Sequence, residues 1–404
     1  MIKTFKELHE NKNTHMTHIE DKVIYGGAKG TREAINALRE LRDVLSGKKV
    51  GQTLSTKWDG APAIFAGQDP TDGKFFVAKK GIFNANPQIY KTPEDVDKFL
   101  KGDLAVKMKD ALLYLPELGI KGVIQGDFLF GKGDVKTKKI DGTSYTTFHP
   151  NTIVYAVPYE QSKPIRDAKI GIVWHTTYKG NTFESMSATF GVNVSKLKKS
   201  KNVWSQDAML RSVNATLTQK ETENVNELLS QAGKLFNQIS GTTLKVLEGN
   251  PTLAGRIETF NNTFVRAGQT PGDSKKHTAA LIDHINKKYQ KEIDSRKTEK
   301  GKGAQVTKRD EEIKFFSPQN RASLEKMFEL QKVIVLAKLK LINKLNSLKK
   351  IDTFVRTKQG YTVTGEEGYV AIDKLGGDAV KLVDRMEFSY NNFSPNILKG
   401  WEKS

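Results

Sequence analysis

The chain has 404 residues and a formal net charge of +19, with 65 Lys and Arg against 46 Asp and Glu. It contains no cysteine, which excludes disulfides, zinc–thiolate sites and cysteine nucleophiles. No apolar run approaches the length that spans a bilayer, so we expect a cytoplasmic protein with no membrane partner. A chain this basic usually binds a polyanion, and the charge therefore favours nucleic acid, with solubility through charge repulsion as the alternative.

The first half of the chain predicts an amphipathic helix followed by a strand-rich region. Residues 31–46 carry apolar side chains at helical spacing, and Gly47 follows them as a stop. A second helical region is predicted from Pro93 to Leu115, with Thr92 as its cap. Strands are predicted at residues 53–56, 63–66, 75–79, 122–130, 152–157 and 170–176.

The second half predicts a block of helices followed by short strands. Residues 298–308 include Gly301 and Gly303 and predict a flexible polar linker inside the helical block. Helices are predicted at residues 225–239, 253–264, 275–291 and 317–349, and strands at 353–357, 361–363, 368–372 and around 381.

These patterns predict an α+β fold in which antiparallel sheets are flanked by helices. Residues 1–195 would form the first part of a catalytic domain, together with N-terminal helices, and residues 351–404 would complete it with C-terminal strands. Residues 196–350 would be an inserted helical domain. The insert is rich in Lys and Arg, so it predicts a nucleic-acid clamp, with a plain helical bundle as the alternative.

The segment Lys57-Trp58-Asp59-Gly60 stands at the end of the predicted strand 53–56. A lysine amine in such a place can act as a nucleophile when it is deprotonated. Asp59 can accept hydrogen bonds from a nucleoside, and Gly60 lets the backbone approach a ligand closely. The alternative for Lys57 is a surface lysine in a loop, so its interpretation depends on the residues that accompany it.

Six further positions follow Lys57 in an order that strengthens this interpretation. Among them, Asp127 lies between apolar neighbours in a predicted strand, where a carboxylate is costly unless it binds something. The six positions are, in chain order, Lys79, Lys80, Asp127, Tyr155, Glu367 and Lys381.

This ordered set resembles the covalent nucleotidyltransferase superfamily of DNA ligases, RNA ligases and mRNA capping enzymes. Within the chain, the resemblance covers about residues 50–160 and 360–395. The K-x-D-G string resembles the motif whose lysine takes the nucleotide, and Gly126-Asp127 resembles a motif in which the family usually has Glu. The string Glu367-Gly368-Tyr369-Val370 resembles the motif whose Glu helps to bind the metal.

The resemblance implies roles for each of these residues. It implies a ligase-type nucleotidyltransferase domain that uses ATP and Mg²⁺, or Mn²⁺, with Lys57 and Lys381 as catalytic residues. Asp127 and Glu367 would bind the metal, and Tyr155 would stack on the purine. The nucleotide-binding residues that the resemblance implies are Asp59, Gly60, Lys79, Lys80, Asp127, Tyr155 and Glu367.

The sequence also departs from the family pattern. Ala61-Pro62-Ala63 stands where an arginine often follows the lysine motif, and Asp127 replaces Glu. About twenty residues follow Lys381, too few for the C-terminal OB-fold that DNA ligases and capping enzymes usually carry. RNA ligases of tailed bacteriophages often lack that module, and their motif often reads E-G-Y-V, as it does at Glu367.

The resemblance therefore predicts a monomeric ATP-dependent RNA ligase that joins 5′-phosphate and 3′-hydroxyl ends, acting in the host cytoplasm if the source is viral. An ATP-dependent DNA ligase that seals nicks is the first alternative, and a capping guanylyltransferase is the second. A non-catalytic nucleic-acid-binding protein on the same fold is an alternative from a different class. The departures favour that last alternative, and the intact Lys57 motif opposes it.

Overall fold

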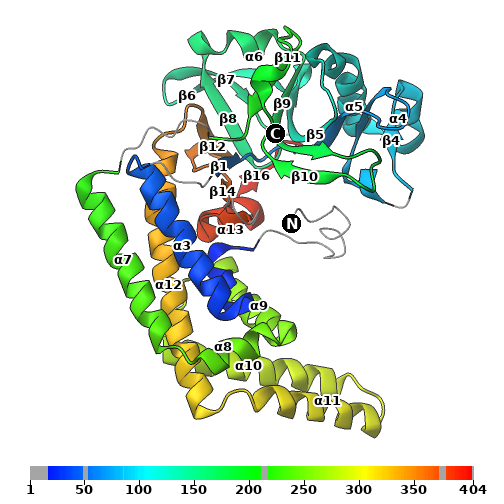
Figure 1. The fold of residues 1–404 in the computed structure, drawn as a ribbon. Coiled ribbons are helices and arrows are strands. Elements are labelled where there is room, and N and C mark those ends of the chain that lie inside the picture. The colour runs from blue at the N-terminus through cyan, green and yellow to red at the C-terminus, as the bar shows by residue number, and fades with distance from the viewer. Residues whose placement is uncertain (1–16, 49–52, 85, 211–216, 373–378, 403–404) are drawn as a thin grey trace.

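The computed structural model describes residues 17–48, 53–84, 86–210, 217–372 and 379–402. Figure 1 shows two units, one rich in strands and one built from long helices, that lie against each other. The fold is α+β, and nearly all strand pairs are antiparallel, as the sequence predicts. Three sheets and one helical bundle together position the candidate site.

The largest sheet has seven strands in the order β10-β9-β5-β2-β3-β4, and β11 pairs with β9 in parallel. Two helices, α4 (Pro93–Phe99) and α5 (Gly102–Tyr114), pack near its β3–β4 edge. The first begins as predicted, because Thr92 and Asp95 cap each other's backbone N–H groups. The strands are β2 (Ala63–Gln68), β3 (Phe75–Ala78), β4 (Ile89–Tyr90), β5 (Val123–Gly131), β9 (Ile170–Lys179), β10 (Ser187–Phe190) and β11 (Val203–Asp207).

A six-stranded sheet packs on the seven-stranded one through a shared apolar cluster that includes Phe130, Phe148 and Val173. Its order is β13-β12-β8-β7-β6, and β16 pairs with β12. The strand β12 follows the helical block in sequence, yet it pairs with β8, which precedes that block. The strands are β6 (Lys136–Ile140), β7 (Thr143–Phe148), β8 (Ile153–Pro158), β12 (Asp352–Thr357), β13 (Gly360–Val363) and β16 (Ile397–Leu398), with α6 (Lys163–Asp167) between β8 and β9.

The third sheet has three strands, β1 (Thr53–Lys57), β14 (Gly368–Ile372) and β15 (Ala379–Leu382). Side chains of a strand alternate between its two faces. One face of this sheet joins the apolar core of the helical unit through five buried side chains. They are Leu54, Tyr369, Ala371, Val380 and Leu382. The other face is therefore free to carry polar side chains.

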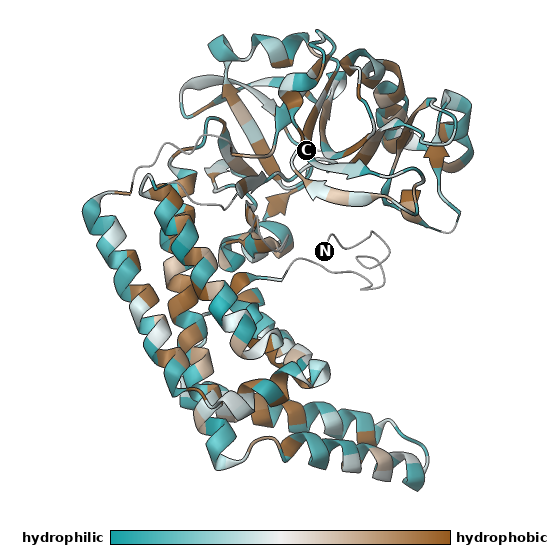
Figure 2. Ribbon diagram, viewed as in Figure 1, coloured by the Kyte–Doolittle hydropathy of each residue, from teal (hydrophilic) through white to brown (hydrophobic). Residues whose placement is uncertain are grey.

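The helical unit is organised around α12 (Pro318–Asn346), a long helix whose apolar residues fill the bundle core. The N-terminal helix α3 (Gly27–Leu45) packs against α7, α8 and α12, so it belongs to this unit rather than to the sheets. Figure 2 shows α7 and α11 as largely hydrophilic. The other helices are α2 (Lys22–Tyr25), α7 (Gln219–Gln238), α8 (Gly241–Glu248), α9 (Pro251–Arg266), α10 (Ser274–Asp294) and α11 (Glu299–Ile313), with α13 (Arg385–Phe393) at the junction of the two units. Among the described helices, none combines the length and the apolarity that crossing a membrane requires.

Two expectations for this region differ from the structure. The linker predicted at 298–308 is wrong, because residues 299–308 lie in α11 and Thr298 caps that helix by accepting a hydrogen bond from the Gly301 N–H at 3.1 Å. Packing against α10 and the pairing of Glu312 with Arg256 at 2.9 Å hold this helix despite its glycines. Strand β11 also falls inside the stretch 196–350 that was predicted to be an inserted helical domain, and it extends the seven-stranded sheet instead.

Candidate functional site

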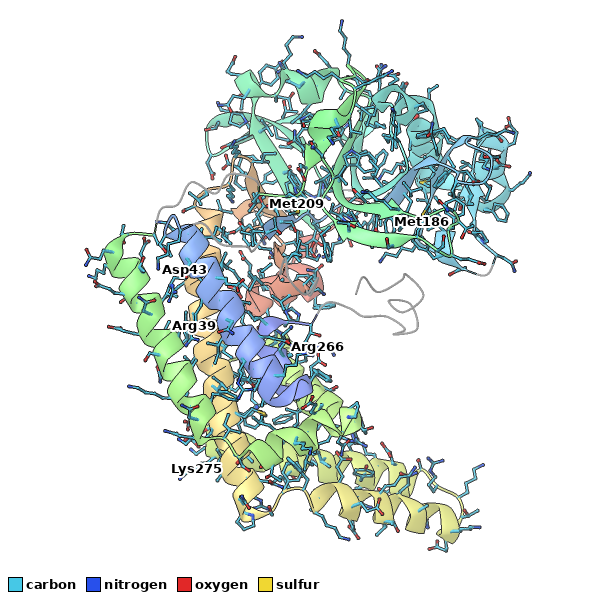
Figure 3. The ribbon with its side chains drawn as sticks, viewed as in Figure 1. Arg39, Asp43, Met186, Met209, Arg266 and Lys275 are labelled. Atoms are coloured by element: carbon cyan, nitrogen blue, oxygen red, sulfur yellow. The ribbon has the colours of Figure 1, made fainter. Side chains whose placement is uncertain are left out.

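A cavity of about 380 Å³ lies between the free face of the three-stranded sheet and the seven-stranded sheet. This volume is within the range of about 300–1,000 Å³ that small-molecule sites occupy. Residues 208–210 join the two sheets, because the Thr56 N–H donates to the Ala208 carbonyl at 2.9 Å and Met209 forms a bridge with Ser55. Met209 is labelled in Figure 3. Six of the nine predicted site residues line the cavity, namely Lys57, Asp59, Gly60, Lys80, Asp127 and Glu367.

The amine of Lys57 forms an ion pair with the carboxylate of Glu367 in the wall of the cavity. Strand pairing brings them together, because Lys57 at the end of β1 lies opposite Gly368, the residue that follows Glu367. Burial raises the pKa of the Glu367 carboxyl, and the neighbouring Lys57 opposes that rise. A basic nitrogen is therefore held beside a carboxyl that accepts a proton more readily than an exposed one does.

Lys381 lies on the same face of the three-stranded sheet as Lys57. Ser55 pairs with Val370, and Val370 pairs with Lys381, so these three side chains form one row across the strands. Burial lowers the pKa of Lys381, and the positive charge of Lys57 lowers it further. The structure thus brings both predicted catalytic lysines to one sheet face, with Lys381 just outside the set of residues that line the cavity.

Asp127 faces this sheet from β5 in the opposite wall. Burial raises its pKa to about 7, although Lys57 and Lys80 favour the charged form. His175 Nε2 on the neighbouring β9 lies 3.8 Å from Asp127 Oδ2. Burial lowers the pKa of His175 to about 4, so its imidazole is neutral at physiological pH and does not neutralise the carboxylate. The Cβ of any residue at Gly60 would stand 2.5 Å from the Asp127 Cβ, so this close approach requires glycine.

The carboxylate of Asp59 is held by the loop that precedes β8. It accepts hydrogen bonds from Asn151 Nδ2 and the Thr152 N–H, both at 2.6 Å, and from the Ile153 N–H at 2.8 Å. Burial raises the pKa of Asp59, and these three donors oppose that rise. Although Asp59 lines the cavity, its oxygens already have protein partners, so it orients the Lys57 loop.

Tyr155 is placed differently from the expectation that it stacks on a purine. Its side chain has no exposed surface, and it lies in the apolar cluster between the two larger sheets, stacked on Phe148 with ring centroids 5.3 Å apart. Its hydroxyl accepts a hydrogen bond from the Asp59 N–H at 2.7 Å. The Trp58 ring, which lines the cavity, packs against the Tyr155 ring with their centroids 4.9 Å apart. Tyr155 therefore supports the Lys57–Asp59 loop from beneath.

Lys79 and Lys80 follow β3 directly, and Lys80 begins the short 3-10 helix Lys80–Phe83. Lys80 is exposed and lines the cavity, whereas Lys79 is not among the lining residues. Sequence reasoning did not assign a site role to Gln125, His175 or Phe190, which also line the cavity. A signal was present for Gln125 alone, because it stands two residues before Asp127 in the same predicted strand.

The carboxylates of Asp127 and Glu367 stand on the two walls of the cavity and could hold a divalent cation. Among the described residues, no group of three or more His, Cys, Asp or Glu side chains is arranged to hold a metal ion. Magnesium commonly binds through one or two carboxylates together with phosphate oxygens of a substrate. The raised pKa of Asp127 indicates a buried carboxyl that lacks sufficient positive charge nearby, so the residues present fit such an ion.

Comparison with known proteins assigns this chain to a family without naming an activity. No curated protein and no solved structure matches the chain. One family model matches residues 13–397, which is nearly the whole sequence. The chain therefore belongs to DUF6267, a family of unknown function.

Proposed function

We propose that this protein is a covalent nucleotidyltransferase, an ATP-dependent polynucleotide ligase whose Lys57 accepts the adenylyl group. The observation that carries the proposal is the convergence of Lys57, Asp127 and Glu367 on one cavity, with Lys381 on the same sheet face. These residues come from strands or strand ends far apart in the sequence. Chance placement of a surface lysine would not bring it into an ion pair with one largely buried acid, across a cavity from a second acid and on the same sheet face as a half-buried lysine.

The first step uses the ion pair between Lys57 and Glu367. The ammonium of Lys57 must lose a proton before it attacks, and Glu367, whose pKa is raised by burial, is in contact to accept it. The free amine would attack the α-phosphorus of ATP and form a phosphorus–nitrogen bond. The bond to the bridging oxygen would break at the same centre, and pyrophosphate would leave with its electron pair.

Two groups would stabilise charge on the attacked phosphate. Lys381 lies beyond Val370 on the same face and would donate to a phosphate oxygen. Asp127 and Glu367 would hold a divalent cation, which would neutralise phosphate charge when bound. The lysyl-AMP would then pass its adenylyl group to a 5′-phosphate, and a 3′-hydroxyl would attack that activated end and release AMP.

Incubation with α-labelled ATP and Mg²⁺ tests the first step. The protein should become labelled on a lysine, the bond should survive alkali and break in acid as a phosphoramidate does, and Lys57→Ala should remain unlabelled. Lys29→Ala, on the exposed side of α3, is the matched control and should label as the native chain does. Unlabelled native protein, or label that persists in Lys57→Ala, would remove the ligase assignment, and unlabelled native protein would favour the non-catalytic nucleic-acid-binding alternative.

A strand-joining assay then distinguishes an RNA ligase from a DNA ligase and from a capping enzyme. The resemblance at Glu367 favours RNA ends, so single-stranded RNA with a 5′-phosphate should be sealed faster than nicked duplex DNA at equal concentration. Preferential sealing of the nick would replace the RNA assignment with the DNA ligase alternative while leaving the lysyl-AMP chemistry in place. Transfer of the nucleotide to a 5′-diphosphate end would instead indicate capping.

A further inference from the structure

Three aromatic side chains near the end of the chain are exposed to water. Tyr390 and Phe393 on α13 are 54% and 68% exposed, and Trp401, shortly after β16, is 67% exposed. Figure 1 shows α13 at the junction between the strand-rich and helical units. Tyr390 and Phe393 are three residues apart on one helix and so share a face, and Lys399 Nζ, two residues before Trp401, donates to the carbonyl of Asn391 on that helix at 2.9 Å. Large aromatic rings are normally buried, and neighbouring exposed ones mark a contact surface.

This C-terminal segment is fixed to the loop that holds Asp59. Thr152 donates a hydrogen bond to Asn392 Oδ1 at 3.2 Å and accepts one from Lys399 Nζ at 2.8 Å. The Gly400 N–H donates to the carbonyl of Asn151 at 2.7 Å, and a Cβ at position 400 would stand 2.0 Å from the carbonyl oxygen of His149. Asn151 itself lines the cavity beside Lys57. The exposed aromatic rings are therefore carried by a segment that is tied to the wall of the candidate site.

We propose that Tyr390, Phe393 and Trp401 form a stacking platform for the unpaired bases of a single-stranded polynucleotide whose end reacts at Lys57. The proposal rests on the proposed function and adds the form of its substrate. Bases of a single strand offer free faces to aromatic rings, whereas bases in a duplex are already stacked on each other. Phe190, exposed at the end of β10 and lining the cavity, would offer a further ring to a base inside the cavity.

The charge of the protein favours this occupant over a second copy of the chain. A net charge of +19 attracts a polyanion and opposes self-association, because two copies repel each other. Attachment to residues 151 and 152 also places the platform next to one wall of the cavity. Aromatic stacking accepts any base, so the platform predicts a ligase with weak sequence preference.

The affinity of a fluorescent oligouridylate tests the platform when it is measured without ATP. Phe393→Ala and Trp401→Ala should each weaken binding about tenfold, the effect of losing one stacked base, and the double variant should lose more. Phe99→Ala is the matched control, since this ring is 57% exposed on α4, and its affinity should equal that of the native chain. Phe393→Tyr, which keeps a ring, should retain most of the affinity. Thermal melting of each variant checks that the fold is intact.

Four outcomes would overturn the platform. The first is a native chain that does not bind the oligonucleotide, and the second is a set of platform variants that bind as the native chain does. The third is an equal loss of affinity for blunt duplex RNA, which would indicate backbone contact rather than stacking. The fourth is a native dimer that the Phe393 or Trp401 variants dissociate in light scattering, because the patch would then bind a second copy. A matching oligodeoxynucleotide distinguishes RNA from DNA strands. Oligonucleotide binding is measured without ATP, so it does not depend on adenylylation. If adenylylation fails, the proposed function is removed, but the affinities of the variants and the native chain can still be compared.

Discussion

Replacing Asp127 with Asn should stabilise the nucleotide-free protein above neutral pH while it removes the proposed activity. Burial raises the pKa of Asp127 from its ordinary value of 3.8 to about 7. Between these two values the unfolded chain releases a proton that the folded protein retains. The free energy of unfolding of the native chain therefore falls as pH rises through this window, and the full penalty is present above about pH 7. Asn has the same shape and does not titrate, so the variant escapes the penalty.

The size of the effect follows from the pKa values. At 1.36 kcal/mol for each pH unit, the difference between 3.8 and about 7 corresponds to about 4 kcal/mol as an upper limit. The side chain is 22% exposed, and water at the cavity screens part of the cost. We therefore expect Asp127→Asn to unfold with a free energy about 2 kcal/mol above that of the native chain at about pH 8, and with little difference at about pH 4.

Urea denaturation at the two pH values, without ATP or divalent metal, measures this difference. Glu184→Gln removes an exposed carboxylate and should show no comparable gain. An Asp127→Asn variant that is no more stable than the native chain at either pH would refute the burial argument. It would mean that neighbouring groups already neutralise the carboxylate in the folded protein. That result would also weaken the proposal that Asp127 binds a divalent cation.

Other features of the structure give three further predictions. Lys338 donates to both Glu20 oxygens at 2.9 and 3.0 Å inside the core, so Lys338→Met should lower the free energy of unfolding by about 3–5 kcal/mol, and adding Glu20→Gln should recover part of the loss in urea titrations. In Gly60→Ala, the new Cβ would stand 2.5 Å from the Asp127 Cβ, so adenylylation should fall at least about tenfold and the protein should lose about 1–3 kcal/mol of stability. Affinity for RNA should fall about tenfold or more between about 50 and 200 mM salt in filter binding; an affinity that ignores salt would contradict a role for the excess basic charge.

Much of the secondary structure follows from local pattern. The helix expected at 31–46 is α3, and the long helix expected from Ser317 is α12, because apolar spacing and caps act within a few residues. The error at 298–308 has the opposite cause. Gly301 and Gly303 destabilise a helix in isolation, but packing against α10 provides the stability that the local sequence does not.

Six of the nine residues predicted for the site line one cavity, but the sequence does not predict how their side chains face one another. A strand residue can face either side of its sheet, and only the pairing partners decide which side meets the cavity. Tyr155 illustrates this, because β8 lies between β7 and β12 and turns that side chain into the interior. His175 and Phe190 reach the cavity only because β9 pairs with β5 and β10 pairs with β9, two registers that no local pattern specifies.

The helical unit helps to position the candidate site, because one face of the three-stranded sheet packs against it. Leu54, Tyr369 and Val380 continue the apolar core of the helices, and the Tyr369 hydroxyl donates to Asn346 Oδ1 at the end of α12 at 2.8 Å. On the reverse of the same strands stand Lys57 and Lys381. Because side chains alternate on a strand, fixing one face of this sheet fixes the other. The helices therefore hold both lysines in register beside Glu367 and opposite Asp127 across the cavity, which a sheet of three short strands could not do alone.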